Sequence, residues 1–405
     1  MEDGLERALS LKELCRATKQ CKKGVLWKDS TANHFLRALT KNQRLADEVR
    51  DGRYKLSPYT IFTIYEPKKR TISATKMRDR VLQRSLCNNG VREDLTRGFI
   101  YDNGACIRGK GKDFTVCRVQ CQLERYYRKH GADGWAVHLD VKSYFPSTPH
   151  REIKKLLQER IREEAYLPYL FEIVDSYSDG SEDPRGIGLG SETSQLVQLA
   201  LLNRLDHRMK EEVKPDVYIR YMDDFLIVDH DREKVEACRR IVTEELEKLS
   251  LKCTDKEGVY PLSRGIKFLQ MRFILTESGK VVTKISDRSI RRERRQLRNL
   301  KELEDRGERT KACRQKHYQS WIATVKPYDS GNALRAMDRY YENLFKEKPQ
   351  YKYKRRKHRH GSFGNSRTAP QGAAEKRCPG TGEQKTEGPD RVHCCMRSPG
   401  DAGGG

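Results

Sequence analysis

The stretch Tyr218-Ile-Arg-Tyr-Met-Asp-Asp-Phe-Leu-Ile-Val228 decides the fold of this chain. Two adjacent carboxylates, Asp223 and Asp224, lie between two apolar arms that are rich in aromatic and β-branched residues. The arms predict two strands, and Met-Asp-Asp predicts the tight turn that joins them. Asp is common in turns because its side chain hydrogen-bonds the local backbone, so the pair alone is weak evidence. A hairpin tip with two carboxylates still offers the oxygen ligands that Mg²⁺ prefers.

A third carboxylate lies upstream, in Trp135-Ala-Val-His-Leu-Asp-Val-Lys-Ser-Tyr-Phe-Pro-Ser147. The apolar residues before Asp140 predict a strand that ends near this carboxylate, and Pro146 is expected to end the regular structure. A two-metal phosphoryl transferase needs carboxylates from separate elements that meet at one point. Asp140, Asp223 and Asp224 supply such a set. A strand-capping role is the alternative for Asp140.

Between these two stretches, a glycine loop runs from Gly186 to Ser194 into an apolar segment. This segment predicts a helix with core positions at Leu196, Leu199, Ala200 and Leu202. Glycines let the backbone approach a nucleotide or a template base closely. A plain glycine turn ahead of a core helix is the alternative.

In this order, the Asp-containing strand, the glycine loop and the Tyr-Met-Asp-Asp turn are similar to the palm of reverse transcriptases. The similarity covers residues 55–345 and includes stretches that resemble the family's fingers motif, its next palm motif and its primer grip: Lys68–Gln83, Leu249–Lys256 and Gly265–Phe273. The run from Gly190 to Gln195 resembles the version in diversity-generating retroelements. The chain is therefore closest in motif style to the bacterial-type reverse transcriptases of those and other prokaryotic retroelements.

Two positions depart from the family pattern. Many bacterial relatives carry Pro-Gln-Gly where this chain has Gly188-Leu189-Gly190. The primer grip usually has Leu-Gly, whereas Leu269 is followed here by Gln270. The first departure concerns the templating pair, so it bears on fidelity and subgroup and leaves the reaction unchanged.

The resemblance implies an α+β fold, a right-hand polymerase with fingers, a palm of antiparallel sheet plus helices, and a helical thumb. We expect an N-terminal helical extension at 1–56, fingers at 57–135, the palm at 136–276, the thumb at 277–346 and a basic, polar tail at 347–405. The fingers are expected to carry short strands and helices. The tail holds almost no core-forming residues, so we expect it to be disordered.

The resemblance also implies the site residues. Asp140, Asp223 and Asp224 would be catalytic and would hold two Mg²⁺ ions with the Val141 carbonyl; Mn²⁺ is a possible substitute. Asp140 and Asp223 would bridge the metals, and Asp224 would support the primer-side metal. Nucleotide-binding roles fall on Arg70, Arg78, Phe145, Gly190, Gln195 and Lys256. The primer grip would consist of Phe268, Leu269 and Gln270.

Several of these roles have alternatives. Phe145 lies five positions after Asp140, where the family's aromatic blocks a 2′-hydroxyl and selects deoxynucleotides, but a plain core role is open. Lys256 is a candidate general acid for pyrophosphate, or an exposed lysine at a helix end. Arg70 and Arg78 are candidate phosphate ligands, or solvated cations. Asp79 and Arg80 can instead pair with each other or with neighbours.

Two basic segments are candidates for nucleic-acid contact. Arg108 and Lys110 lie in a glycine-rich loop that suits template backbone or a triphosphate; a solvated turn is the alternative. The predicted thumb helix carries Arg291, Arg292, Arg294 and Arg295, which we expect to contact backbone phosphate. Consecutive residues of a helix point to different faces, so about half of them can reach a duplex together. A solvated helix face is the alternative.

Composition agrees with a polyanionic partner. The formal charge is +24, from 82 Lys and Arg against 58 Asp and Glu, and basic surfaces gain affinity for nucleic acid by releasing counterions. No apolar run reaches the ~18–20 residues that span a bilayer, so we expect no membrane partner. The 12 cysteines lack paired Cys-x-x-Cys spacing and indicate a reducing, cytoplasmic location.

The sequence thus predicts an RNA-directed DNA polymerase of a prokaryotic retroelement. Its partners would be an RNA template, a DNA or RNA primer and deoxynucleoside triphosphates, with an accessory protein or a cognate structured RNA as further candidates. One alternative is a defence-type protein that makes DNA without a template or from a protein primer. An RNA-dependent RNA polymerase and a non-catalytic nucleic-acid-binding protein are the others. Phe145 argues against the RNA polymerase, and the three retained carboxylates argue against a non-catalytic role.

Overall fold

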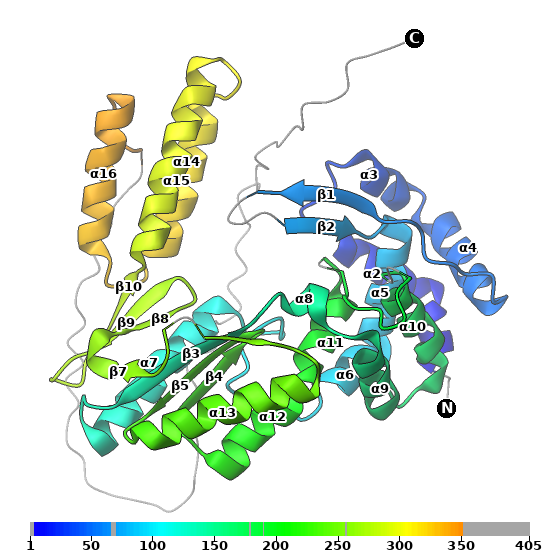
Figure 1. The fold of residues 1–405 in the computed structure, drawn as a ribbon. Helices are drawn as coiled ribbons and strands as arrows, with labels where there is room; N and C mark the ends of the chain where they lie inside the picture. Colours follow the sequence, from blue (N-terminus) through cyan, green and yellow to red (C-terminus); the bar gives the residue numbers. More distant parts are fainter. Residues whose placement is uncertain (1–3, 66–69, 178–179, 189, 256, 351–405) are drawn as a thin grey trace, which may run out of the picture. The chain divides into compact units, whose positions relative to one another are not determined.

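The computed structural model describes residues 4–65, 70–177, 180–188, 190–255 and 257–350 (Figure 1). The chain divides into two compact units. The first lies within Met1–Arg291 and Tyr328–Gly331, and the second within Arg292–Pro327 and the residues from Asn332 onward. The expected tail falls almost entirely outside the described residues.

A five-stranded antiparallel sheet forms the centre of the first unit. Its strands run in the order β4 (Val217–Tyr221), β5 (Asp224–Asp229), β3 (Trp135–Val141) and β6 (Cys253–Asp255), and β7 (Tyr260–Pro261) also pairs with β3. The apolar arms around Met222 and Asp223 therefore form the predicted pair of strands, and the strand predicted before Asp140 is confirmed as β3.

Two smaller sheets complete the strands of the described chain. One is the hairpin of β1 (Thr60–Ile64) and β2 (Arg70–Ala74). The other has the order β10 (Val281–Ile285), β9 (Met271–Leu275) and β8 (Ile266–Phe268). Because antiparallel sheets occur together with many helices, the predicted α+β class is confirmed.

Helices make up most of the remaining regular structure of the described residues (Figure 1). Those of the first unit are α1 (Gly4–Leu9), α2 (Leu11–Cys21), α3 (Asp29–Leu36), α4 (Ala38–Arg50), α5 (Met77–Leu86), α6 (Arg92–Thr96), α7 (Lys112–His130), α8 (Tyr144–Ser147), α9 (His150–Arg160), α10 (Leu167–Asp175), α11 (Glu192–Leu201), α12 (Asn203–His207) and α13 (Arg232–Lys248). The second unit is helical, with α15 (Lys311–Val325), α16 (Gly331–Phe345) and most of α14 (Asp287–Asp305).

Alternation along the central strands sorts their side chains into two cores. Leu139 of β3 and Ile227 of β5 join one core, which includes residues of α11 and α13. Ala136 and Leu226, on the opposite face, join a second core with residues of α7, β8 and β9. Successive side chains of a strand point to opposite faces, so Asp140 and Asp224 share the face of Ala136 and Leu226. Both carboxylates thus lie on the side of α7 and the β8–β9 hairpin.

Two local predictions are wrong. Pro146 was expected to end the regular structure, but it lies inside the one-turn helix α8. Proline is tolerated in the first turn of a helix because the N–H that it lacks has no partner there. The helices expected between 57 and 135 were short, yet α7 has 19 residues. It is long because one of its faces packs along the central sheet.

Candidate active site

Neighbouring strands bring the three predicted carboxylates together. Asp223 lies in the turn between β4 and β5, where Met222 adopts a φ of 60°. Asp224 opens β5 and is the register partner of Asp140 on β3. Residues opposite each other on one face of an antiparallel pair have Cβ atoms about 4.5–5.5 Å apart. The fold therefore joins positions separated by more than 80 residues of sequence.

The electrostatics of this cluster favour a bound cation. Burial, followed by the charges of Asp224 and Asp140, raises the pKa of Asp223 from 3.8 to about 7. Three carboxylates in one partly buried place repel each other, and a cation at their oxygens removes that cost. Their oxygen ligands match Mg²⁺ or Mn²⁺, and Val141 follows Asp140 at the end of β3. The residues present therefore fit the predicted divalent metal.

A buried ion pair fixes the turn that carries Asp223. Arg220 of β4 and Asp206 of α12 are both fully buried, and the guanidinium donates to both carboxylate oxygens at 2.5 and 2.7 Å. Arg220 also donates to the Met222 carbonyl at 2.9 Å and to the Leu199 carbonyl at 3.0 Å. The pair thus ties the turn to α11 and α12. Sequence reasoning missed it, although one arginine in an apolar strand was a usable signal.

His138 is a second neighbour that the sequence did not suggest. Its Nε2 lies 3.1 Å from Asp224 Oδ1, and its ring meets that of Phe268 edge to face at 5.5 Å between centroids. The alternation of β3 places His138 on the face of Asp140. His138 therefore connects the predicted primer grip to the carboxylate cluster.

Two of the three predicted primer-grip residues form a turn, and the third, Phe268, ends β8. Leu269 and Gln270 join β8 to β9 with φ angles of 50° and 66°. The Ser286 N–H donates to the Gln270 carbonyl at 3.0 Å, which holds the turn against the start of α14. Gln270 occupies a left-handed position that glycine adopts at lower cost, so the departure from Leu-Gly carries backbone strain.

Phe145 lies directly beyond the strand that carries Asp140. Its ring meets that of Tyr144 edge to face, and it is half-buried, whereas Tyr144 is buried and donates to the Gln198 carbonyl at 2.6 Å. The Phe145 carbonyl accepts from the Ile187 N–H at 3.0 Å. The glycine loop therefore packs against α8 beside the half-buried Phe145.

Three predicted residues line one hollow. Arg108, Gly190 and Gln195 border a cavity of 380 Å³ together with Arg84, Arg92, Cys106, Ile107 and Glu192. Glu192 pairs with Arg84 at 2.5 Å and also with Arg92. The walls are therefore rich in arginine, which suits an anionic ligand.

The glycine loop makes its close approach to a tyrosine of this chain. A Cβ at Gly188 would lie 1.8 Å from the Tyr177 hydroxyl oxygen, so only glycine fits. The Tyr177 ring stacks on Tyr59 at 4.7 Å between centroids. Leu189, the next loop residue, lies outside the described residues.

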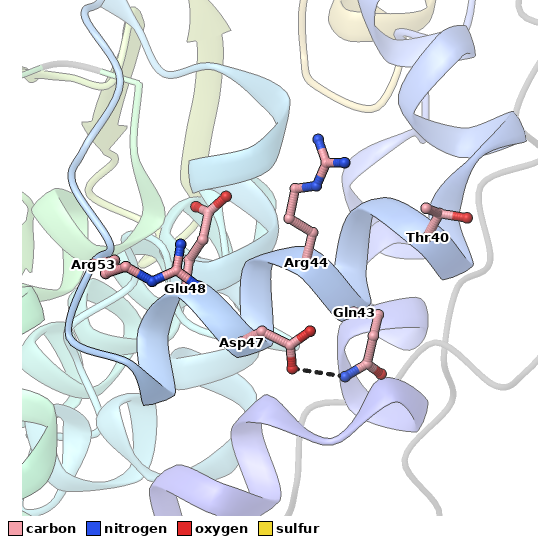
Figure 2. A pocket seen from close by; sticks show the side chains of 6 residues that line it. All are labelled: Thr40, Gln43, Arg44, Asp47, Glu48 and Arg53. Atoms are coloured by element: carbon pink, nitrogen blue, oxygen red, sulfur yellow. Dashed lines mark hydrogen bonds between the residues drawn. The ribbon is translucent and has the colours of Figure 1, made fainter.

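Arg78, another predicted phosphate ligand, is held by contacts within this chain. Arg78 pairs with Glu48 of α4 at 2.8 Å and lies 5.1 Å from the ring centroid of Tyr54. Glu48 also lines a hollow of 470 Å³ together with Thr40, Gln43, Arg44, Asp47 and Arg53. Figure 2 shows these six side chains. These contacts attach Arg78 to the N-terminal helices. Asp79 is buried and accepts from the Tyr54 hydroxyl at 3.1 Å and the Ser57 N–H at 3.2 Å.

The remaining predicted cations have mixed surroundings. Arg70 is exposed on β2, and Lys256 lies outside the described residues. Lys110 donates to the Tyr101 carbonyl at 2.6 Å, so it closes its own loop. Arg108 of the same loop is exposed.

The four arginines of α14 differ in exposure. Arg291 and Arg295 are exposed, one helical turn apart, whereas Arg292 and Arg294 are half-buried. Arg294 lies 5.2 Å from the ring centroid of Tyr340 on α16. Arg291 and Arg295 therefore present more of their side chains to solvent than Arg292 and Arg294 do.

Carboxylates on a palm-like hairpin, a nearby aromatic and an arginine-lined hollow define a nucleotidyltransferase of the polymerase type. The chain belongs to the family "Reverse transcriptase (RNA-dependent DNA polymerase)", whose model matches residues 65–269. The matched range contains the carboxylate cluster, the glycine loop and the first residues of the primer grip.

Two individual proteins resemble this chain at low sequence identity. The chain is similar to protein YkfC of Escherichia coli (strain K12), with 26% identity over 283 residues, covering 58% of this chain and 72% of that one. Among solved structures, a Sicinivirus 3Dpol RNA-dependent RNA polymerase matches with a TM-score of 0.40 and 15% identity. That match covers 62% of this chain, and the chain spans 58% of the viral polymerase. No helix within the described ranges is both long and apolar enough to cross a membrane.

Proposed function

We propose that this polymerase is an RNA-directed DNA polymerase that extends a primer on an RNA template by two-metal nucleotidyl transfer. The observation that carries the proposal is the register of Asp140 with Asp224 beside the Asp223 turn, inside the range that matches the family. We further propose that it serves a prokaryotic retroelement, on the motif style of its glycine loop. Template RNA, a DNA or RNA primer and deoxynucleoside triphosphates are the corresponding partners.

Three carboxylates and one backbone carbonyl are the proposed cation ligands. Asp140, Asp223 and Asp224 would hold the cations, and the Val141 carbonyl would add a ligand. When bound, the two cations lower the pKa of the primer hydroxyl and neutralise the departing pyrophosphate. The ion pair of Arg220 keeps the turn in place, so the ligand oxygens need not be reorganised during the reaction.

Substrate positioning falls on side chains around the cluster. Phe145 would lie against the sugar and exclude a 2′-hydroxyl. Phe268, with the turn at Leu269 and Gln270, would hold the primer end, and its contact with His138 couples that grip to Asp224. Arg108, Gly190 and Gln195 would receive the template or the incoming nucleotide in the arginine-lined hollow. Phosphate groups are proposed to contact three further side chains, those of Arg70, Arg78 and Lys256.

Primer extension with separate RNA, DNA and no template tests the proposal, with Asp223→Asn as the inactive control. We expect deoxynucleotide incorporation that depends on an RNA template and on Mg²⁺ or Mn²⁺, and none from the variant. Equal synthesis without a template would replace the proposal by the defence-type alternative. Preferred incorporation of ribonucleotides would replace it by an RNA polymerase.

A further inference from the structure

A cluster of two histidines and one aspartate lies at the other end of the central hairpin. His130 is the last residue of α7, Asp216 directly precedes β4, and His230 directly follows β5. The catalytic turn joins the opposite ends of the same two strands. Strands of five and six residues at about 3.3 Å per residue separate the two places by roughly 16–20 Å. The cluster is therefore distinct from the active site.

The spacing of the donor atoms is close to that of a metal site. His130 Nε2 lies 3.0 Å from Asp216 Oδ2, and His230 Nδ1 lies 3.5 Å from the same oxygen. One ligand atom from each residue lies within 4.8 Å of the other two. A tetrahedral ion with bonds of about 2.0–2.1 Å holds its donors roughly 3.3 Å apart. Two of the three separations thus already bracket the required value.

Two of these atoms lack a conventional partner. His130 Nε2 and Asp216 Oδ2 are buried, and neither has a hydrogen bond of acceptable geometry to another described residue. Buried polar atoms are nearly always satisfied, and these two atoms, 3.0 Å apart, attract each other as an ion pair only when the His130 ring is protonated. A cation between them would satisfy both.

The surrounding charges allow this cation. Asp229 Oδ1 lies 2.9 Å from His230 Nδ1, and Asp229 Oδ2 accepts from the Asp216 N–H at 3.1 Å. Lys129 reaches Asp216 Oδ1 at 2.6 Å, and Lys234 reaches Asp229 Oδ2 at 2.9 Å. The side chain of Lys129 is 65% exposed, so a metal ion can displace it into water at little cost.

We propose that His130, Asp216 and His230 bind one transition-metal ion of the zinc class. Imidazole and carboxylate ligands suit Zn²⁺ and leave a fourth position for water. The two rings stack at 4.2 Å with an interplanar angle of 9°, so their nitrogen lone pairs lie in nearly parallel planes. Binding requires His230, with a side chain 54% exposed, to rotate out of the stack and its Nδ1 to leave Asp229. The ion would fasten the end of α7 to the outer ends of β4 and β5.

Zinc titration of the full-length chain in excess Mg²⁺ tests the proposal. Mg²⁺ occupies the catalytic carboxylates, and a chromophoric competitor reports the affinity of the remaining sites. We expect the parent to bind one more equivalent than His230→Gln, or to bind it more than about tenfold tighter. Zinc should raise the melting temperature of the parent and not that of the variant, because a ligand stabilises only the state that binds it. Since His230 is exposed, its substitution leaves folding intact.

Two matched variants make the assignment specific. Cys378→Ser/Cys394→Ser/Cys395→Ser removes all three thiols of the tail and should retain the extra equivalent. Lys129→Gln removes the cation that competes for Asp216 and should tighten zinc binding. Equal zinc stoichiometry, affinity and melting shift in the parent and in His230→Gln would overturn the proposal. Loss of the equivalent in the cysteine variant would do the same, because it would place the ion in the tail.

Discussion

Replacing Arg220 by Met should separate the stability of the fold from the geometry of the turn that carries Asp223. Methionine replaces the unbranched apolar stem of arginine but carries no charge and no N–H donor. The change removes four hydrogen bonds, of which two reach Asp206, one reaches the Met222 carbonyl and one reaches the Leu199 carbonyl. It leaves the Asp206 carboxylate fully buried without its cation.

The expected loss follows from that unpaired charge. Removing one partner of a buried ion pair costs about 3–5 kcal/mol, against a typical total stability of about 5–15 kcal/mol. The variant Arg220→Met should therefore fold but unfold at lower urea concentration. In Arg220→Met/Asp206→Asn the charge is absent, and the Tyr218 hydroxyl, which donates to Asp206 at 2.8 Å, keeps an acceptor. The residual cost should be about 1–3 kcal/mol, from carbonyls without donors.

Activity should not recover with stability. Both variants lack the donor to the Met222 carbonyl, so the left-handed conformation of Met222 loses its support. A misplacement that costs 1.4 kcal/mol in the transition state slows incorporation about tenfold. We expect at least that loss in both variants, measured by primer extension below the unfolding transition.

Two assays on the same preparations decide the matter. Urea unfolding gives the free energy of each variant, and single-turnover incorporation gives its rate. A loss of less than about 1 kcal/mol in Arg220→Met would refute the argument from the buried pair. Full activity in the double variant would refute the link between this pair and the turn. Arg220→Lys is the control: it keeps the charge without the planar fork, so it should fall between the parent and Arg220→Met.

Four further changes test other parts of the site. Asp223→Asn should abolish incorporation. Ionisation of a carboxylate with a raised pKa costs stability as the pH rises from about 4 to 7. Without metal, the free energy of unfolding in urea should therefore be about 1–3 kcal/mol higher for the variant than for the parent at pH 8, and the two values should become equal near pH 4. Phe145→Ala should raise the ratio of ribonucleotide to deoxynucleotide incorporation, and an unchanged ratio would reject the sugar gate. Arg291→Ala/Arg295→Ala should flatten the slope of log affinity against log salt for RNA–DNA duplexes by about one unit per lost contact, whereas an equal slope would assign both side chains to a solvated face. Gln270→Gly should raise the free energy of unfolding by about 0.5–1 kcal/mol by relieving a positive φ, and destabilisation would mean that the glutamine side chain outweighs the strain.

The roles of two polar side chains in the central sheet, Arg220 and His138, could not be predicted from the sequence. Arg220 and His138 lie in segments that were correctly predicted as strands, yet their roles were missed. A strand pattern gives the face to which a side chain points, but it does not give the partner across the sheet. The partner of Arg220 is Asp206, which comes from a helix, and His138 meets Phe268 from a separate hairpin. Neither pairing follows from local periodicity.

The contacts of the predicted phosphate ligands could not be predicted from the sequence either. Arg78 fits the fingers motif by sequence, but its ion pair with Glu48 depends on the packing of α4 beside α5. The glycine loop was predicted to allow a close approach, and the structure identifies Tyr177 as the neighbour at Gly188. The roles of these residues toward nucleic acid stay predictions.

The sequence by itself determined the family and the strands on both sides of Met222 and Asp223. It also singled out three carboxylates as candidate metal ligands. Local chemistry carries that information, because apolar alternation, turn residues and ordered motifs are properties of short segments. Only the tertiary structure decided which distant side chains meet: Asp140 with Asp224, Arg220 with Asp206, and His130 with Asp216 and His230. These contacts join residues 14 to 100 positions apart, where burial and strand register set the neighbours and the linear order does not.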